Sequence, residues 1–89
     1  MVNALVLLNV ERDKINGVGE TLAALDGVTE VYSVAGKYDL AAVIRVKENE
    51  QLAQLVTDKI RSLKGIERSE TLIAFRAYSK GDREMGFAQ

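Results

Sequence analysis

The sequence of 89 residues contains no cysteine and no histidine. These absences exclude thiol nucleophiles, disulfide bonds, imidazole bases and the most common ligands of transition metals. The 12 basic residues are balanced by 13 acidic ones, so the net charge of -1 lacks the broad positive field with which proteins bind nucleic acid phosphates. The composition therefore excludes most familiar catalytic chemistries and makes nucleic acid an unfavourable partner.

Long hydrophobic runs are also missing. The apolar segment at residues 2–8 is too short to span a membrane, and it has neither the preceding basic region nor the following cleavage site of a signal peptide. We therefore expect a cytoplasmic protein without membrane contact. The length, the hydrophobic fraction of 47% and the charged fraction of 28% are typical of one small globular domain. We expect this domain at residues 1–78, followed by a polar tail at 79–89.

Hydrophobic periodicity predicts the order strand, helix, strand, strand, helix, strand. Strands are expected at residues 2–10, 28–35, 39–47 and 66–78. The first helix is expected to be capped by Asp13 and to end at Gly27, and the second to open at Asn49, beside the acidic pair Glu48 and Glu50, and to end at Gly65.

The two halves of the chain repeat faintly, so that Val18 aligns with Val56 and Gly27 with Gly65. Two βαβ units with right-handed crossovers give an α+β, ferredoxin-like βαββαβ sandwich. In this fold a four-stranded antiparallel sheet has the order 4-1-3-2 and carries both helices on one face. The charged residues of the expected outer strands agree with this order, because charge protects sheet edges.

The second face of the predicted sheet is apolar where a solvated face would be polar. Alternation places Leu5, Leu7, Ala41 and Val43 on that face of the two central strands. A contiguous apolar patch of this kind marks an interface or a ligand site. A second copy of the same sheet is the simplest cover, so we expect a dimer formed through this face; the alternative is a monomer with a moderately apolar open face.

A glycine turn at Gly36-Lys37 joins the second and third strands and is followed by Tyr38 and Asp39. In one interpretation this is a plain hairpin in which Asp39 satisfies turn amides. In the other it is a site for a small zwitterion, because amides exposed at a glycine turn bind a carboxylate while an acidic side chain binds an ammonium group.

Two segments resemble signature motifs of the effector domain of the Lrp/AsnC family, also called the RAM domain. Residues 25–39 read LDGVTEVYSVAGKYD, which resembles the family pattern hydrophobic-x-Gly-Val-x-x-x-Tyr-x-Val-x-Gly-x-Tyr-Asp. Residues 63–71 read LKGIERSET, which resembles Leu-x-Gly-Val-x-x-Thr-x-Thr with Ser69 in place of the first threonine. The resemblance covers about residues 2–78.

The resemblance implies the ferredoxin-like fold, dimers formed through their sheets, and rings of dimers, commonly octamers. We expect no cofactor, no metal and no catalysis. It also implies that a small amino-acid effector binds where neighbouring dimers meet. The residues that correspond to the effector site are Ala35, Gly36, Lys37, Tyr38, Asp39, Ser69 and Thr71.

Full-length regulators of this family begin with a helix-turn-helix DNA-binding domain, whereas the first strand here starts at Val2. Both helices are needed to cover the sheet, and none is left to enter a DNA groove. We therefore expect a stand-alone form that senses amino acids, co-assembles with full-length regulators, or does both, without direct DNA binding. The alternative is a small dimeric ferredoxin-like enzyme resembling monooxygenases, which the absence of histidine and tryptophan disfavours.

Overall fold

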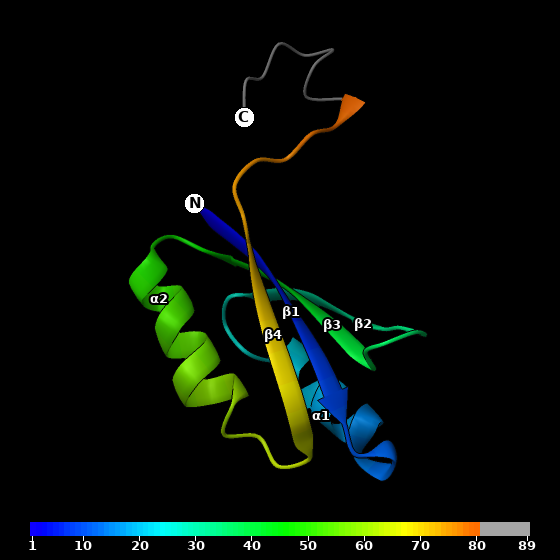
Figure 1. Ribbon diagram of the computed structural model, residues 1–89. Helices are drawn as coiled ribbons and strands as arrows, with labels where there is room; N and C mark the ends of the chain where they lie inside the picture. The colour runs from blue at the N-terminus through cyan, green and yellow to red at the C-terminus, as the bar shows by residue number, and fades with distance from the viewer. Residues whose placement is uncertain (81–89) are drawn as a thin grey trace.

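The computed structural model describes residues 1–80 and contains one four-stranded antiparallel sheet (Figure 1). The strands are β1 (Val2–Val10), β2 (Val28–Ser33), β3 (Leu40–Val46) and β4 (Ile66–Ala74). Their order across the sheet is β2-β3-β1-β4, so the sequence-based order 4-1-3-2 is confirmed. Every neighbouring pair is antiparallel, with β1 and β3 in the centre and β2 and β4 at the edges.

Two helical regions connect the strands. The first is a 3₁₀ turn, η1 (Arg12–Lys14), that leads into α1 (Ile15–Ala23). Asp13 does not cap this helix as the sequence predicts: it lies within the 3₁₀ turn, and the residue at the helix N-cap is Lys14. The second is α2 (Asn49–Gln54), which begins where predicted. It continues as a wider π-helical segment, η2 (Leu55–Ile60), which the periodicity does not reveal.

The core lies between one face of the sheet and both helices. The strand residues on this face are buried at even positions, as alternation in the sequence predicts. Leu22 of α1 and Ile60 of η2 occupy equivalent positions of the sequence repeat, and both are fully buried. The buried hydrophobic residues are Ala4, Val6, Leu8, Val10, Val18, Leu22, Val28, Leu40, Ala42, Ile44, Leu52, Leu55 and Ile60.

Gly27 and Gly65 lie in the turns directly before β2 and β4 and have positive backbone φ angles of 95° and 102°. The helical segments end earlier, at Ala23 and Ile60, so the glycines do not end them as the sequence predicts. L-amino acids with side chains rarely adopt a positive φ. At Gly27 space is short as well, because an added Cβ would lie 2.9 Å from Cγ1 of Val46 and 3.2 Å from Cδ2 of Leu55. The repeat of the two glycines therefore reflects a backbone requirement at both helix-to-strand turns.

The strand ends differ from the prediction by one residue at each end of β3, and by more at the ends of β2 and β4. β2 ends at Ser33 rather than residue 35, because the pair Ser33 and Leu40 is the last of that ladder and the chain then turns. β4 ends at Ala74 rather than residue 78, since its partner strand begins at Val2 and the last pair is Asn3 with Ala74. Most of the predicted tail, residues 81–89, lies outside the described residues.

The face of the sheet away from the helices carries the apolar patch that the sequence predicts. Leu5 lies between Val43 on β3 and Leu72 on β4, and in the next row Leu7 lies beside Ala41. Leu5 is 41% exposed and Leu72 is 42% exposed. The other residues of this patch are half-buried: Leu7, Ala41 and Val43. We call Leu5, Leu7, Ala41, Val43 and Leu72 the open-face patch.

Candidate functional site

The hairpin between β2 and β3 is fastened to the end of β1. The amide of Val34 donates to the carbonyl of Asp39 at 3.0 Å, which closes the hairpin. Nδ2 of Asn9 donates to the carbonyl of Lys37 at 2.9 Å, and the amide of Asp39 donates to the carbonyl of Leu8 at 2.8 Å. These bonds hold the hairpin at the end of β1, which is the end of the sheet where β4 begins.

Asp39 also uses its side chain within the chain. Its Oδ2 accepts a hydrogen bond from the amide of Val10 at 2.9 Å, where β1 ends. The sequence predicts in one interpretation that Asp39 satisfies amides of the hairpin turn; the amide that its carboxylate accepts here belongs to Val10, outside that turn. Ala35, Gly36 and Lys37 are exposed, and Gly36 adopts a positive φ of 125° at the tip, which the sequence signals as a glycine turn.

Tyr38 leaves the hairpin on the side of the open-face patch. Its hydroxyl donates to Oε1 of Glu70, the β4 residue paired with Leu7. The hydrogen bond to Glu70, desolvation and the Glu70 charge raise the pKa of Tyr38, while the Arg68 charge lowers it. In the sequence Glu70 is one of the charged residues of an expected outer strand. The sequence signal for Glu70 is its position between Ser69 and Thr71, because alternation along a strand places its side chain on the face opposite to theirs.

Ser69 and Thr71 project from β4 toward the helices. They pair with the buried residues Leu8 and Val6 and share their face of the sheet. The structure therefore brings the hairpin residues together, but it places the two hydroxyl residues on the other side of the sheet from the contact between Tyr38 and Glu70. One chain alone does not assemble the predicted effector residues around one cavity.

Between β4 and the second helical region lies a groove with two hollows that share Val56 and Thr71. The first, of about 500 Å³, we call the charged section; it is lined by Val56, Arg61, Ile66, Glu67, Arg68, Ser69 and Thr71. The second, of about 580 Å³, we call the apolar section; it is lined by Met1, Val2, Asn49, Leu52, Ala53, Val56, Thr57, Thr71, Ile73, Ala74 and Phe75. Sequence reasoning identified the hydroxyl residues but not Arg61 and Arg68.

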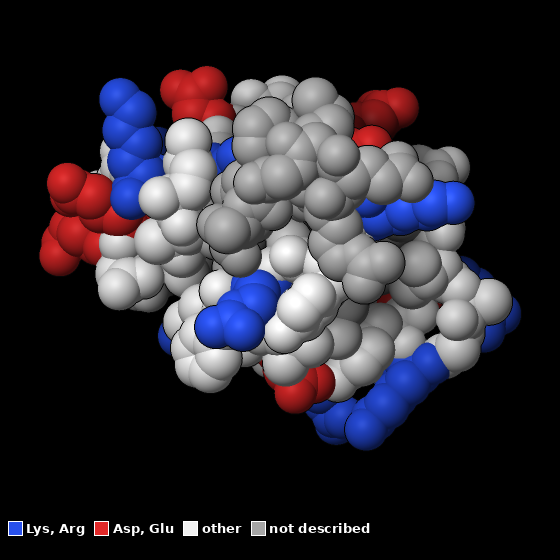
Figure 2. Space-filling view, turned by 90° about the horizontal axis from the view of Figure 1, so that it is seen from above, with Lys and Arg blue, Asp and Glu red and all other residues white. Residues whose placement is uncertain are grey.

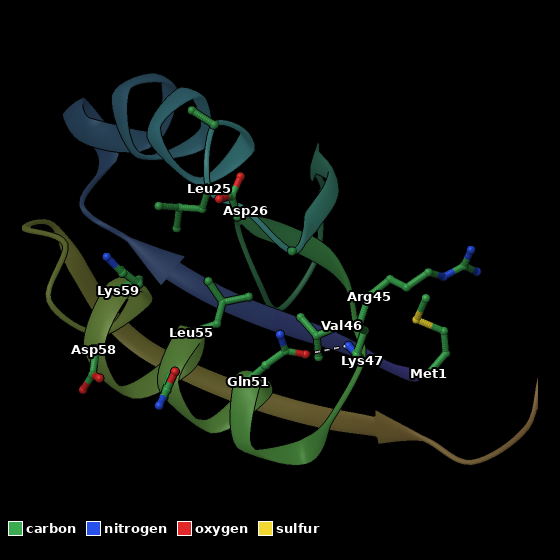
Figure 3. Close-up of a pocket in the computed structure, with 13 residues that line it drawn as sticks. Met1, Leu25, Asp26, Arg45, Val46, Lys47, Gln51, Leu55, Asp58 and Lys59 are labelled. Carbon is green, nitrogen blue, oxygen red and sulfur yellow. Dashed lines mark hydrogen bonds between the residues drawn. The ribbon is translucent and has the colours of Figure 1, made fainter.

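A further hollow of about 670 Å³ lies between the turn after α1, the end of β3 and α2 (Figure 3). Figure 3 shows Leu25, Val46 and Leu55 around its centre, while the side chain of Arg45 extends away from it. None of the predicted site residues lines this hollow. It is therefore separate from the effector residues that the sequence predicts.

Within residues 1–80, no group of three or more histidine, cysteine, aspartate or glutamate residues is placed to hold a metal ion. In the same part of the chain, no helix has the length and apolar character needed to cross a membrane. The chemistry that the described surface offers is hydrogen bonding and ion pairing from hydroxyl, guanidinium, carboxylate and backbone groups.

Comparison with known proteins identifies relatives over almost the whole chain. The crystal structure of TTHA0845 from Thermus thermophilus is 49% identical with a TM-score of 0.85, and the match covers 90% of this chain and 100% of that one. The crystal structure of FFRP-DM1 is 36% identical with a TM-score of 0.81, covering 84% of this chain and 100% of that one.

Curated relatives are longer. The HTH-type transcriptional regulator FL11 of Pyrococcus horikoshii is 32% identical over 77 residues, which are 86% of this chain and 50% of that regulator. The first curated relatives that match are covered over 39% of their length. This chain therefore spans about half or less of most of the regulators that it resembles.

Two more distant structures share the fold. The complex of the transcriptional regulator NMB0573 with L-Met from Neisseria meningitidis has a TM-score of 0.80 at 11% identity, covering 88% of this chain and 52% of that one, which shows the fold alone. The siroheme decarboxylase NirDL has a TM-score of 0.71 at 26% identity, and the match covers 84% of this chain but 26% of the enzyme.

The decisive match is to a family. Residues 3–84 match the Lrp/AsnC ligand binding domain, in agreement with the two motifs and with the order of the strands. The chain belongs to the Lrp/AsnC family of transcription regulators, and the matched residues are its ligand-binding domain.

Proposed function

We propose that this chain is a regulatory module that binds a small amino-acid effector between copies of itself. The observation that carries the proposal is the division of the effector residues in a single chain: the hairpin at 35–39 projects from one end of the sheet, while Ser69 and Thr71 face the helices. A ligand in contact with both sets takes the hairpin from one copy and the hydroxyl groups from another. Binding then depends on assembly, and assembly responds to binding.

The first step of assembly is a dimer through the open-face patch. Its residues are contiguous across β3, β1 and β4 in the ladder register, and patches of this kind mark interfaces. A chain of 89 residues gains a larger shared core by pairing two such faces. Dimers would then join into an octamer or a similar ring through the hairpins, which remain accessible at the sheet end.

The regulatory partners are full-length members of the family. The described part of this chain carries no third helix beyond those that cover the sheet, and Figure 2 shows acidic and basic side chains interspersed around the visible face rather than a field of one sign. Direct DNA binding is therefore not part of the proposal. This chain would change the activity of a full-length regulator in the cytoplasm by joining its assembly.

The test is a thermal unfolding screen of the chain against the amino acids at millimolar concentration. A ligand bound only by the folded state raises the melting temperature, and at 100 times its Kd it contributes about 2.7 kcal/mol. Thr71→Val, which keeps the shape but removes the hydroxyl, should reduce that rise. Ser62→Ala is the matched control, since the Ser62 hydroxyl donates to the carbonyl of Lys59 away from the groove. The absence of stabilisation by every amino acid contradicts the proposal.

The enzyme alternative has one supporting observation, the likeness to the decarboxylase NirDL. The curated relatives, in contrast, are all named as transcriptional regulators. Absorption spectroscopy of the purified chain separates the two functions. A tetrapyrrole or flavin spectrum that persists through purification would support the enzyme, and an amino-acid response without such a spectrum would support the regulator.

A further inference from the structure

The end of β4 lacks the charges that its beginning carries. Glu67, Arg68 and Glu70 lie near the start of this strand, whereas residues 71–74 carry no charge. Within residues 1–80, β4 is an edge of the sheet and pairs with β1 alone, so its outer side faces no other strand. Charged side chains protect a sheet edge from pairing with another chain. The end of β4 has no such protection.

The chain that follows β4 is also exposed and apolar. Leu72 and Ile73 are exposed on opposite faces of the strand. Figure 1 shows the chain leaving β4 and leading away from the sheet and both helices. We call residues 75–79 the arm; in it, Phe75 is 100% exposed and Tyr78 is 82% exposed. Large aromatic side chains stabilise a structure when they are buried, so this stretch suits an interface.

The opposite edge of the sheet is a poorer surface for pairing. β2 has six residues, and its register with β3 shifts between Val28 and Glu30. β4 has nine residues, and its register with β1 shifts only where β1 ends, between Asn9 and Val10. Short length and bulges both hinder the pairing of an edge with a further strand. A further strand is therefore expected at β4.

We propose that residues 71–79 of two copies of this chain pair as antiparallel strands around a two-fold axis at Phe75. Each copy contributes the end of β4 as an edge and the arm as the strand that covers the edge of the other copy. Such a contact uses the same surface on both sides and closes with two copies. It is an interface additional to the open-face patch and to the hairpin at 35–39.

The register of this pairing is complementary on both faces. On the helical face, Phe75 meets its counterpart, and Ala77 of the second copy lies beside Ile73, at the apolar section of the groove. On the other face, Tyr78 of the second copy lies beside Leu72. Apolar and aromatic side chains that lie directly opposite each other stabilise an antiparallel pair.

The charges favour the same position of the axis. With the axis at Phe75, Lys80 of the second copy comes opposite Glu70, so a basic side chain meets a carboxylate. With the axis at Ala74, Lys80 would come opposite Arg68 instead. With the axis at Arg76, two copies of that arginine would face each other. A shift by one residue in either direction therefore places like charges together, which destabilises a strand pair.

The experiment uses the absence of cysteine from the sequence, because a single introduced cysteine then reports its own neighbour. Opposite residues of an antiparallel pair have Cα atoms ~4.5–5.5 Å apart, which a disulfide can bridge. The full chain with Phe75→Cys should form a linked dimer in oxidised glutathione at least about tenfold faster than the control Glu67→Cys, because pairing raises the local thiol concentration. Glu67 is exposed on the same strand but lies outside the paired segment.

A mixture of two variants tests the register and keeps Phe75 in place. Copies with Ile73→Cys should link to copies with Ala77→Cys faster than to one another. Adding Leu5→Asp, which weakens the open-face dimer, should leave both cross-links in place. The proposal is overturned if neither the mixture nor Phe75→Cys links faster than Glu67→Cys, or if Leu5→Asp abolishes the links. Faster self-linkage of Ile73→Cys than of Phe75→Cys would overturn the position of the axis.

Discussion

The carboxylate of Asp39 and the amide of Val10 are joined by a hydrogen bond of 2.9 Å that links the start of β3 to the end of β1. The same aspartate donates its own amide to the carbonyl of Leu8 at 2.8 Å. A motif residue associated by resemblance with effector binding thus holds the sheet together at the end where the hairpin projects. The contribution of Asp39 to stability can be separated from any contact with a ligand by substitution.

Replacing Asp39 separates these two roles. Asp39→Ala leaves the Val10 amide without its acceptor and should lower the free energy of unfolding by about 1–3 kcal/mol. Asp39→Asn keeps an oxygen acceptor and should recover most of that loss in urea unfolding at equal protein concentration. If the asparagine variant retains stability but loses the amino-acid response, Asp39 also contacts the ligand. Equal stability of the alanine variant and the natural protein would show that the hydrogen bond contributes nothing.

The hydrogen bond between Tyr38 and Glu70 predicts that the stability of the folded chain depends on pH in the alkaline range. The folded-state pKa of Tyr38 is raised above 10.0 because its neutral hydroxyl donates to the Glu70 carboxylate. The stabilisation is therefore fully present below pH 10 and is lost as the pH rises through the raised value. Unfolding measured across this range should show that the stability difference between the natural protein and Tyr38→Phe shrinks as the pH increases.

Glu70→Gln is the companion variant for this measurement. It weakens the hydrogen bond that holds the neutral Tyr38 hydroxyl and removes the Glu70 charge, so the tyrosinate absorbance of Tyr38 should develop at lower pH than in the natural protein. A titration curve unchanged by Glu70→Gln would contradict the assigned cause.

Two glycine substitutions should change stability in opposite directions. Gly27→Ala introduces a Cβ at a φ of 95° and at 2.9 Å from Val46, and we expect a loss of more than about 1 kcal/mol. Gly17→Ala lies within α1, where an added Cβ meets no atom within 4 Å, and should stabilise the chain by about 0.5–1 kcal/mol. Thermal unfolding measures both, and losses of equal size would contradict the argument from backbone conformation.

The open-face patch predicts an effect on association. Leu5→Asp places a carboxylate between Val43 and Leu72, and burying it against a second copy is unfavourable. We expect the Kd of the dimer to rise at least about tenfold in light scattering or sedimentation. Ala23→Asp on the exposed side of α1 is the control for added charge and should leave association unchanged. A natural protein that remains monomeric at micromolar concentration would exclude the dimer.

Strand order, core and open face were predictable because they depend on alternation and periodicity, which local sequence encodes directly. Val6 and Leu8 face the helices and Leu5 faces away, as the pattern requires. The strand ends were less predictable, since β4 ends where β1 offers no further partner rather than where its own composition changes.

The site was predictable in its residues but not in its arrangement. Motif spacing identifies Ser69 and Thr71, yet nothing local indicates that Arg61 from the helical layer lines the same hollow. The hydrogen bond between Tyr38 and Glu70 joins residues 32 positions apart, and such pairs depend on the register of the whole sheet.

The π-helical segment η2 affects the direction of the side chains after it. Such a turn holds about one residue more than an α-helical turn, so each later side chain is rotated by roughly 100° relative to an uninterrupted helix. Arg61 is the residue immediately after this segment, and the amide of Arg61 donates to the carbonyl of Val56, five positions earlier. The extra residue therefore sets the direction in which the Arg61 guanidinium leaves the helical layer, and a change of chain length within the segment would turn that charge toward a different neighbour.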